Sequence, residues 1–153
     1  MDFELFKVRK NNLYYLMEME ELGFCNSTAE TFNQTHNITD VLLRASHTKN
    51  YFGKIKFHRD KKGERAIGFS SFSINQKAKI HDLCLIKDYS SKIYLKVLLV
   101  ATLSSVKRKL EENFDSIYLT INSTNNQILL EICQELGFEI ISTGEKIKLI
   151  LKL

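Results

Sequence analysis

The stretch from Leu119 to Phe138, LTINSTNNQILLEICQELGF, contains two periodicities in succession. Apolar residues first alternate with polar ones, which predicts a strand, and then recur at helical spacing, which predicts an amphipathic helix. The polar residues between the two can cap the helix, and Gly137 is placed to end it, because glycine readily adopts the left-handed conformation found there. The stretch therefore predicts a strand, a helix and the beginning of another strand at Phe138.

A long helix precedes this stretch, and three strands precede that helix. The helix is predicted from apolar residues at helical spacing, and Lys107 to Lys109 lie in its last turns, where cations suit the negative end of the helix dipole. The apolar residues are Leu95, Leu98, Leu99, Leu103, Val106 and Leu110. The three strands are separated by polar turns at 58–65 and 75–77 and are expected to form an antiparallel meander. Their ranges are Tyr51 to His58, Ala66 to Ile74 and Ala78 to Ile86.

The N-terminal third predicts one strand and two helices. The strand runs from Phe3 to Val8, and the first helix covers residues 11–23, with asparagines to cap it and a glycine to end it. Ser27 and Glu30 have the spacing of a capping box, which predicts a second helix that continues to Ala45.

The order of the expected elements defines the fold class. Two closing strands, Phe138 to Ser142 and Ile147 to Leu153, surround Gly144. A strand, a helix and a strand between Ala78 and Ile121 favour a parallel pair joined by a right-handed crossover, while the hairpins are antiparallel. We therefore expect an α/β (α+β) fold, with a mixed, twisted sheet of about six or seven strands and helices on both faces. No linker or internal repeat is visible, so residues 1–153 are expected to form a single domain.

Composition narrows the classes of protein that fit this chain. Cys25, Cys84 and Cys133 are odd in number and far apart, which favours reduced thiols in a cytoplasmic protein over disulfides. The histidines and cysteines lack metal-ligand spacing, so no metal site is expected. No apolar run approaches the roughly 20 residues of a membrane span, and the N-terminus lacks the pattern of a secretory signal. The formal net charge of +4 suits an anionic ligand. The chain has clusters of lysines, but it lacks the aromatic motif of an RNA-binding sheet.

Two segments of the chain resemble the GNAT superfamily of N-acetyltransferases. The segment IHDLCLIKDY, from Ile80 to Tyr89, is similar to the family's central strand, with Lys87 in place of a common proline. From Asn126 to Phe138, an asparagine, a helix and the sequence Leu-Gly-Phe stand at the family's spacing, with Cys133 where a tyrosine is common. With the order of elements, the resemblance covers nearly the whole chain and implies the GNAT fold.

The resemblance implies a binding site for acetyl-coenzyme A. Backbone groups of the central strand, at Leu83, Cys84 and Leu85, would pair with the pantetheine arm, and the pyrophosphate would lie at the start of the long helix. That loop corresponds to Ser90, Ser91, Lys92, Ile93, Tyr94 and Leu95, and Asn126 is a further cofactor residue. The loop is degenerate, because Ser90 replaces a glutamine or arginine, and Ile93 and Leu95 replace glycines. Ser90 and Ser91 offer hydroxyls and backbone donors in compensation, and Lys92 offers a cation.

The catalytic candidates are His81, Asp82 and Cys133. Transfer of an acyl group from a thioester to an amine requires a base, and His81 is the better candidate because its unperturbed pKa lies near neutrality. Neighbouring residues on a strand face opposite ways, so only one of His81 and Asp82 is expected to point into the site. Cys133 can donate a proton only weakly to the departing thiolate, and a buried core position is its simpler interpretation. Tyr94 and Tyr118 are alternative acids.

These observations leave two functions open. The first is an acyl-CoA-dependent N-acyltransferase that moves an acetyl group from acetyl-CoA to an amine on a small molecule or protein. The alternative is a non-catalytic GNAT-like module that binds a protein or nucleic-acid partner, which the missing glycines and the missing tyrosine favour. The oligomeric state stays open, although homodimers through an edge strand or hairpin are common in the family.

Overall fold

The computed structural model describes residues 2–6, 29–31, 50–56, 66–86, 89, 91–122 and 127–153. Within these residues, all seven strands expected from the sequence are present, along with both of the C-terminal helices. The strands are β1 (Asp2–Phe6), β3 (Asn50–Lys56), β4 (Ala66–Ile74), β5 (Ala78–Ile86), β6 (Ser116–Asn122), β7 (Glu139–Ser142) and β8 (Lys146–Lys152). A further short strand, β2 (Ala29–Thr31), lies where the capping-box spacing predicts a helix, so that prediction is wrong for these residues.

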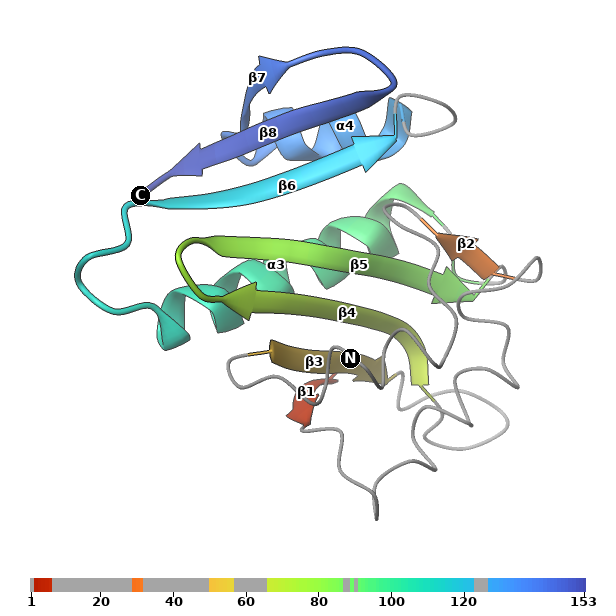
Figure 1. The fold of residues 1–153 in the computed structure, drawn as a ribbon. Helices are drawn as coiled ribbons and strands as arrows, with labels where there is room; N and C mark the ends of the chain where they lie inside the picture. Colours follow the sequence, from red (N-terminus) through yellow and green to blue (C-terminus); the bar gives the residue numbers. More distant parts are fainter. Residues whose placement is uncertain are drawn as a thin grey trace.

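The strands form one mixed sheet in the order β1-β3-β4-β5-β6-β8-β7, with β2 pairing with β5 outside this path (Figure 1). The neighbours from β1 to β5 are antiparallel, and the same holds for β6, β8 and β7. Only β5 and β6 are parallel among the described pairs, and the helix α3 (Lys92–Lys109) connects them. The mixed sheet and the crossover expected from the sequence are therefore confirmed.

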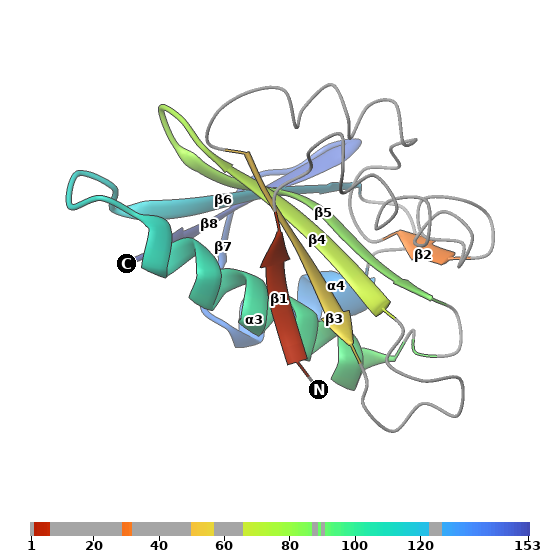
Figure 2. The same cartoon turned by 90° about the horizontal axis from the view of Figure 1, so that it is seen from below.

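Both described helices cover the same face of the sheet (Figures 1 and 2). Leu95, Leu98, Leu99 and Val106 of α3 are fully buried against the strands. The second helix, α4 (Gln127–Glu135), packs against α3 and buries Leu129 and Ile132. This core also contains Phe69, Phe72, Ile80, Leu119 and Leu149. Burial of such side chains contributes about 25 cal/mol of folding free energy per Å² of apolar surface removed from water. The packing of the two helices therefore stabilises the sheet.

The end of α4 has the geometry that the glycine in the sequence predicts. Gly137 has a φ of 98°, in the left-handed region that favours glycine. The Phe138 N–H donates to the Cys133 carbonyl at 2.9 Å, and the Gly137 N–H donates to the Gln134 carbonyl at 3.1 Å. These two bonds form a Schellman motif, which ends the helix and directs the chain into β7.

Several sequence-based predictions lie outside the described residues. They include the helix over 11–23, the hairpin at 58–65, and the cofactor candidates Ser90 and Asn126. Among the described helices, none has both the length and the hydropathy needed to cross a membrane.

Candidate functional site

The parallel strands β5 and β6 separate part of the way along their length. They pair at three positions, Ala78 with Ile117, Lys79 with Tyr118 and Ile80 with Leu119. Both strands then continue, β5 to Ile86 and β6 to Asn122, without further pairing between them. The edge of β5 beyond Ile80 is therefore not paired with β6, so its backbone groups are available to pair with another chain or ligand arm.

A β-bulge lies on β5 at the point of separation. Ser71 of β4 is opposite Asp82, but the next residue, Phe72, is opposite Ile80, so His81 is the extra residue. Bulges commonly lie next to active sites, where the additional residue changes the direction of a side chain. His81 is therefore located both at the bulge and next to the last pair that joins β5 to β6.

The bulge directs His81 and Asp82 to the same face of the sheet. The Nε2 atom of His81 lies 2.6 Å from the Ser73 Oγ, and the Ser71 hydroxyl donates to the Asp82 Oδ2. Ser71 and Ser73 are two residues apart on β4, so their side chains share a face. The unbroken alternation along β5 that the sequence-based expectation assumes is interrupted by the bulge, so both side chains lie on one face of the sheet.

The face that carries these residues is the one opposite α3. The Thr102 hydroxyl of α3 donates to the Ser70 Oγ at 2.7 Å, so Ser70 faces the helix. Its neighbours Ser71 and Ser73 consequently face the other way. We call this opposite side, with His81 and Asp82, the far face. Asp82 is fully buried there and His81 is partly buried.

The start of α3 has the donors that an anionic group needs. Ser91 is the N-cap, and its Oγ accepts from the Tyr94 N–H at 3.5 Å. The N–H groups of Lys92 and Ile93 in the first turn have no acceptor within the helix, and no acidic residue occupies that turn. Ile93 lies inside the regular helix with its side chain 72% exposed, so its β-branch meets no unusual backbone angle. Leu95 is fully buried beneath the sheet and does not face solvent.

Two cations at the start of α3 are already paired with α4. The Lys92 Nζ lies 2.7 Å from the Glu135 carboxylate and 3.7 Å from that of Glu131, and the Lys96 Nζ lies 3.3 Å from Glu135. Hydrogen bonding to Glu135 raises the pKa of Lys92, and hydrogen bonding to Lys92 and Lys96 lowers the pKa of Glu135. The compensating cation expected at Lys92 is thus shared with two carboxylates.

The separated edge of β5 is occupied in part by β2. Ala29 pairs with Ile86, Glu30 with Leu85 and Thr31 with Cys84. Because β4 pairs with Leu85 and Cys84 on one edge of β5, β2 must lie along the other, the edge that β6 leaves (Figure 1). Two of the expected cofactor positions, Cys84 and Leu85, therefore have a strand partner on this edge, while Leu83 lies beyond the described residues of β2.

The described thiols are located in the core. Cys84 and Cys133 are both free and fully buried. Desolvation by burial raises the pKa of Cys133 to about 12, which disfavours its thiolate and matches a small core residue. Of the alternative acids, Tyr94 makes an edge-to-face contact with Tyr89 at 5.2 Å, and the Lys77 Nζ lies 4.9 Å from the Tyr118 ring centroid.

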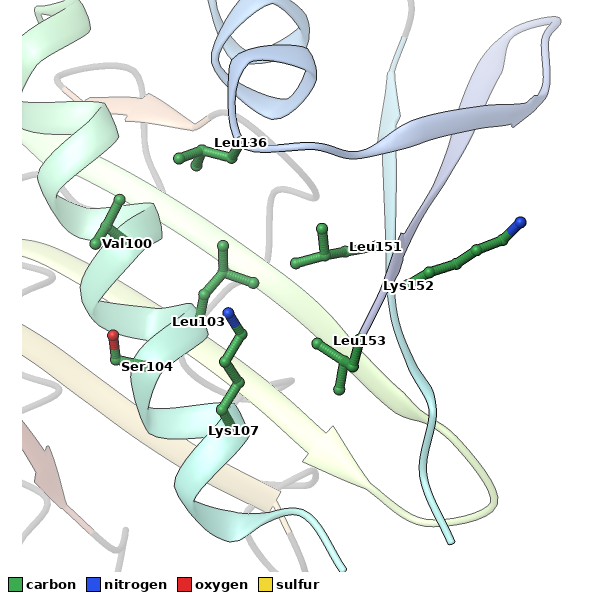
Figure 3. A pocket seen from close by; sticks show the side chains of 8 residues that line it. All are labelled: Val100, Leu103, Ser104, Lys107, Leu136, Leu151, Lys152 and Leu153. Carbon is green, nitrogen blue, oxygen red and sulfur yellow. The ribbon is translucent and has the colours of Figure 1, made fainter. Parts of the chain in front are cut away.

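Two hollows among the described residues lie away from the separated edge. A groove of about 240 Å³ lies on the helix face, between α3, the end of α4 and the end of β8 (Figure 3). A second hollow of about 360 Å³ lies at the β4–β5 turn and is lined by Ser73, Asn75, Gln76, Lys77 and Lys79. Ser73 connects the second hollow to His81, whereas the groove lies on the opposite side of the sheet.

The sequence alone does not identify Ser71 and Ser73 as members of the site. Their roles depend on the bulge, which puts His81 and Asp82 beside them. A signal was available in the run of serines at 70, 71 and 73 within an otherwise apolar strand. Buried hydroxyls in such a strand require hydrogen-bond partners, so they indicate polar side chains on the neighbouring strand.

No family model matches the sequence, and no curated protein matches it. Solved structures resemble it over nearly its whole length. The PaiA N-acetyltransferase of Thermoplasma acidophilum, in complex with coenzyme A, has 16% identity and a TM-score of 0.60, with 100% of both chains covered. The ribosomal-protein-S18-alanine N-acetyltransferase of Escherichia coli has 11% identity and a TM-score of 0.65, covering 97% of this chain and 91% of the other.

A chain of the NatC complex, bound to Gag peptide and CoA, has 16% identity and a TM-score of 0.68, covering 100% of this chain and 99% of the other. Identities this low establish likeness of fold and leave the chemistry to be argued from the site. The chain therefore has the fold of the GNAT N-acetyltransferases, as the resemblance in its sequence implies.

Proposed function

We propose that this chain is an N-acyltransferase of a single domain that moves an acetyl group from acetyl-CoA to an amine in the cytoplasm. The observation that carries the proposal is the separation of β5 from β6 beside the bulge at His81. It combines a strand edge that can pair with an extended ligand arm and a side chain that can act as a base. The structures with this fold that were solved with coenzyme A support the same conclusion.

The residues that would hold acetyl-CoA lie on α3 and β5. The Ser91 hydroxyl and the first N–H groups of α3 would bind the pyrophosphate, since the helix dipole also favours an anion there. Backbone groups on the separated edge of β5, beginning at Leu83, would pair with the pantetheine arm. When bound, acetyl-CoA would supply the acetyl group as a thioester; attack of the amine on its carbonyl carbon would form the C–N bond and break the C–S bond, with CoA leaving as its thiolate.

The far face supplies the proton transfer. The imidazole of His81 takes the proton from the attacking nitrogen, either directly or through a water. The contact between its Nε2 and the Ser73 Oγ fixes the orientation of the ring. The Asp82 carboxylate is buried and accepts a hydrogen bond from the Ser71 hydroxyl. It therefore stabilises the strand next to the base and is not exposed to the attacking amine. The contacts of the two serines support the choice of His81 over Asp82 as the base.

Binding of acetyl-CoA is tested by thermal unfolding. At a concentration of about 100 times the dissociation constant, binding adds about 2.7 kcal/mol to the free energy of unfolding, or several degrees in Tm. Ser91→Glu should abolish most of that shift because it places an anion beside the pyrophosphate, whereas Ser104→Glu on the exposed side of α3 should not. Mass spectrometry of a mixture of amines then identifies acetylated products. A Tm unchanged by millimolar acetyl-CoA would contradict the proposal.

A second function is favoured by the pairing of β2 with Cys84, Leu85 and Ile86. If that pairing is permanent, the chain is a GNAT-like module that binds a protein or nucleic-acid partner without transferring an acyl group. The ion pairs of Lys92 with α4 agree with this alternative, because they engage the cation nearest the pyrophosphate site. The same unfolding experiment separates the two functions.

A further inference from the structure

Four lysines gather on the far face from two segments that are distant in the sequence. Ser73 pairs with Lys79, Lys79 with Tyr118, and Tyr118 with Ile150, so these residues form a row across β4, β5, β6 and β8. Lys148 and Lys146 lie two and four residues before Ile150 on β8, and therefore share its face. Lys77 lies at the β4–β5 turn, with its Nζ against the Tyr118 ring. We call Lys77, Lys79, Lys146 and Lys148 the basic cluster.

The charges of the basic cluster are not neutralised by the acids described nearby. Its members take part in none of the ion pairs between described residues, which join Lys92 and Lys96 to α4 and Lys152 to Glu139. Desolvation and the charges of Lys77, Lys146 and Lys148 lower the pKa of Lys79. Four cations that repel one another raise the energy of the folded chain, and an anion bound among them would lower it.

The basic cluster borders the site of the proposed reaction. Lys77 and Lys79 line the 360 Å³ hollow together with Ser73, and the Ser73 Oγ contacts the Nε2 of His81. A carboxylate held in this hollow would therefore lie next to the group that takes the proton from the amine. We propose that the acceptor is an acidic peptide, whose α-amine reaches His81 while its carboxylates lie along the basic cluster. This inference rests on the proposed acetyl transfer.

The spread of the lysines favours a chain with several carboxylates over a small acidic amine. Ile150 lies two strand spacings, about 10 Å, from Lys79, and Lys148 lies two residues further along β8, so about 12 Å separates the backbones of Lys79 and Lys148. Lys146 follows at about 7 Å along β8. One carboxylate cannot contact all three cations, whereas successive acidic residues of an extended peptide can.

Tyr118 bears on the choice between a peptide and a nucleic acid. Recognition of single-stranded RNA commonly uses an aromatic ring as a stacking surface for bases. The Tyr118 ring is the aromatic group in the row, and the Lys77 ammonium covers it at 4.9 Å from its centroid. The ring is therefore engaged as a partner for a cation, which leaves the cluster as a set of charges suited to carboxylates.

The test compares short peptides of equal length that begin with alanine and continue with glutamate, glutamine or lysine. Each is measured as an acceptor with saturating acetyl-CoA, and a copy labelled at its C-terminus is measured for binding by fluorescence anisotropy. The glutamate peptide should have the lowest KM and the tightest binding, and both should weaken as salt screens the charges. Lys79→Gln with Lys148→Gln should raise its KM about tenfold, since each exposed charge pair is worth up to about 1 kcal/mol.

The controls separate this inference from the proposed function. Lys107→Gln, an exposed lysine of α3 on the opposite face, should leave the KM for the glutamate peptide unchanged. The double variant should retain the Tm shift with acetyl-CoA. If acetyl-CoA binds and the glutamine peptide is acetylated as well as the glutamate peptide, the inference is wrong and the proposed function stands. If acetyl-CoA shifts the Tm and the glutamate peptide binds but receives no acetyl group, the inference that the peptide is the acceptor is wrong; if acetyl-CoA does not shift the Tm, the proposed function fails. Tighter binding of a single-stranded RNA than of the glutamate peptide would also overturn the inference.

Discussion

In the proposed reaction the chemistry would depend on His81, because the bulge gives it a position that a regular strand would not. Its side chain shares the far face with Asp82, yet only Asp82 is fully buried. The buried Asp82 carboxylate accepts a hydrogen bond from a serine hydroxyl and stabilises the sheet. The partly buried imidazole of His81 lies where β5 and β6 separate, so it can reach a ligand. The two neighbours therefore have different roles despite pointing the same way.

Replacement of the base should slow chemistry without weakening cofactor binding. We expect His81→Gln to lower kcat by about 10²- to 10⁴-fold, the usual contribution of a general base, and to leave the Tm shift with acetyl-CoA intact. Ser73→Ala removes the hydroxyl 2.6 Å from the Nε2 and should lower kcat by a smaller factor, because the ring remains but loses its fixed orientation. Steady-state kinetics at saturating acetyl-CoA measures both. A wild-type kcat in His81→Gln would assign the proton transfer to another group.

At the scale of elements, β2 pairs with backbone groups that the proposed cofactor arm would also use. β2 pairs with Cys84 to Ile86 on the edge that β6 leaves, and an added ligand strand would use this edge too. A three-residue strand contributes only a few hydrogen bonds, each worth about 0.5–1.5 kcal/mol net. A ligand with many further contacts at α3 can displace it.

Glu30→Pro tests this competition directly. Proline removes a backbone donor and is poorly tolerated within a strand pair, so the variant should release β2 from β5. We expect the dissociation constant of acetyl-CoA, measured by calorimetry, to fall about tenfold, which corresponds to about 1.4 kcal/mol. Glu30→Ala is the matched control, since it removes the same side chain and keeps the N–H. Equal affinities in the two variants would show that β2 and the cofactor do not share the edge.

The sequence predicts regular elements well and their irregularities poorly. The ranges of β4 and β5 agree with the prediction at both ends, because strand periodicity and polar turns define them without reference to the rest of the chain. The bulge at His81 leaves no such pattern, since it depends on how β4 and β5 align. β2 was missed because Ser27 and Glu30 have capping-box spacing, while the free edge of β5, formed by residues far along the chain, offers a strand partner instead.

At the scale of the whole molecule, the sheet brings together charges that the sequence keeps apart. Lys77 and Lys79 lie about half-way along the chain, and Lys146 and Lys148 lie near its end. Only the order β5-β6-β8 makes them neighbours, so the sequence by itself does not indicate this cluster. The part of the candidate site that lies within one strand, at His81 and Asp82, could be predicted from the sequence. The contacts between strands, at Ser71, Ser73 and the lysines, could not.

The basic cluster should cost stability, and the cost should depend on pH. Desolvation, and then the charges of Lys77, Lys146 and Lys148, lower the pKa of Lys79 from 10.5, so near that value the unfolded chain binds more protons than the folded one. Below the folded pKa, the charged Lys79 lowers the free energy of unfolding by its full amount. The free energy of unfolding then increases as the pH rises from the folded pKa to 10.5, because Lys79 loses its proton first in the folded chain. Lys79→Gln should consequently unfold at higher urea concentration than the wild type at pH 7.

That difference should shrink as the pH approaches and passes 10.5, where Lys79 of the wild type is neutral in both states. Lys107→Gln, on the opposite face, serves as the control for general effects of losing a lysine, and should unfold at the same urea concentration as the wild type or slightly lower, because Lys107 suits the negative end of the α3 dipole. Added glutamate peptide should raise the unfolding midpoint of the wild type more than that of Lys79→Gln, because it supplies the anion that the cluster lacks. If Lys79→Gln and Lys107→Gln unfold alike at pH 7, the lysines do not repel one another in the folded chain, and the physical basis for an acidic acceptor is lost.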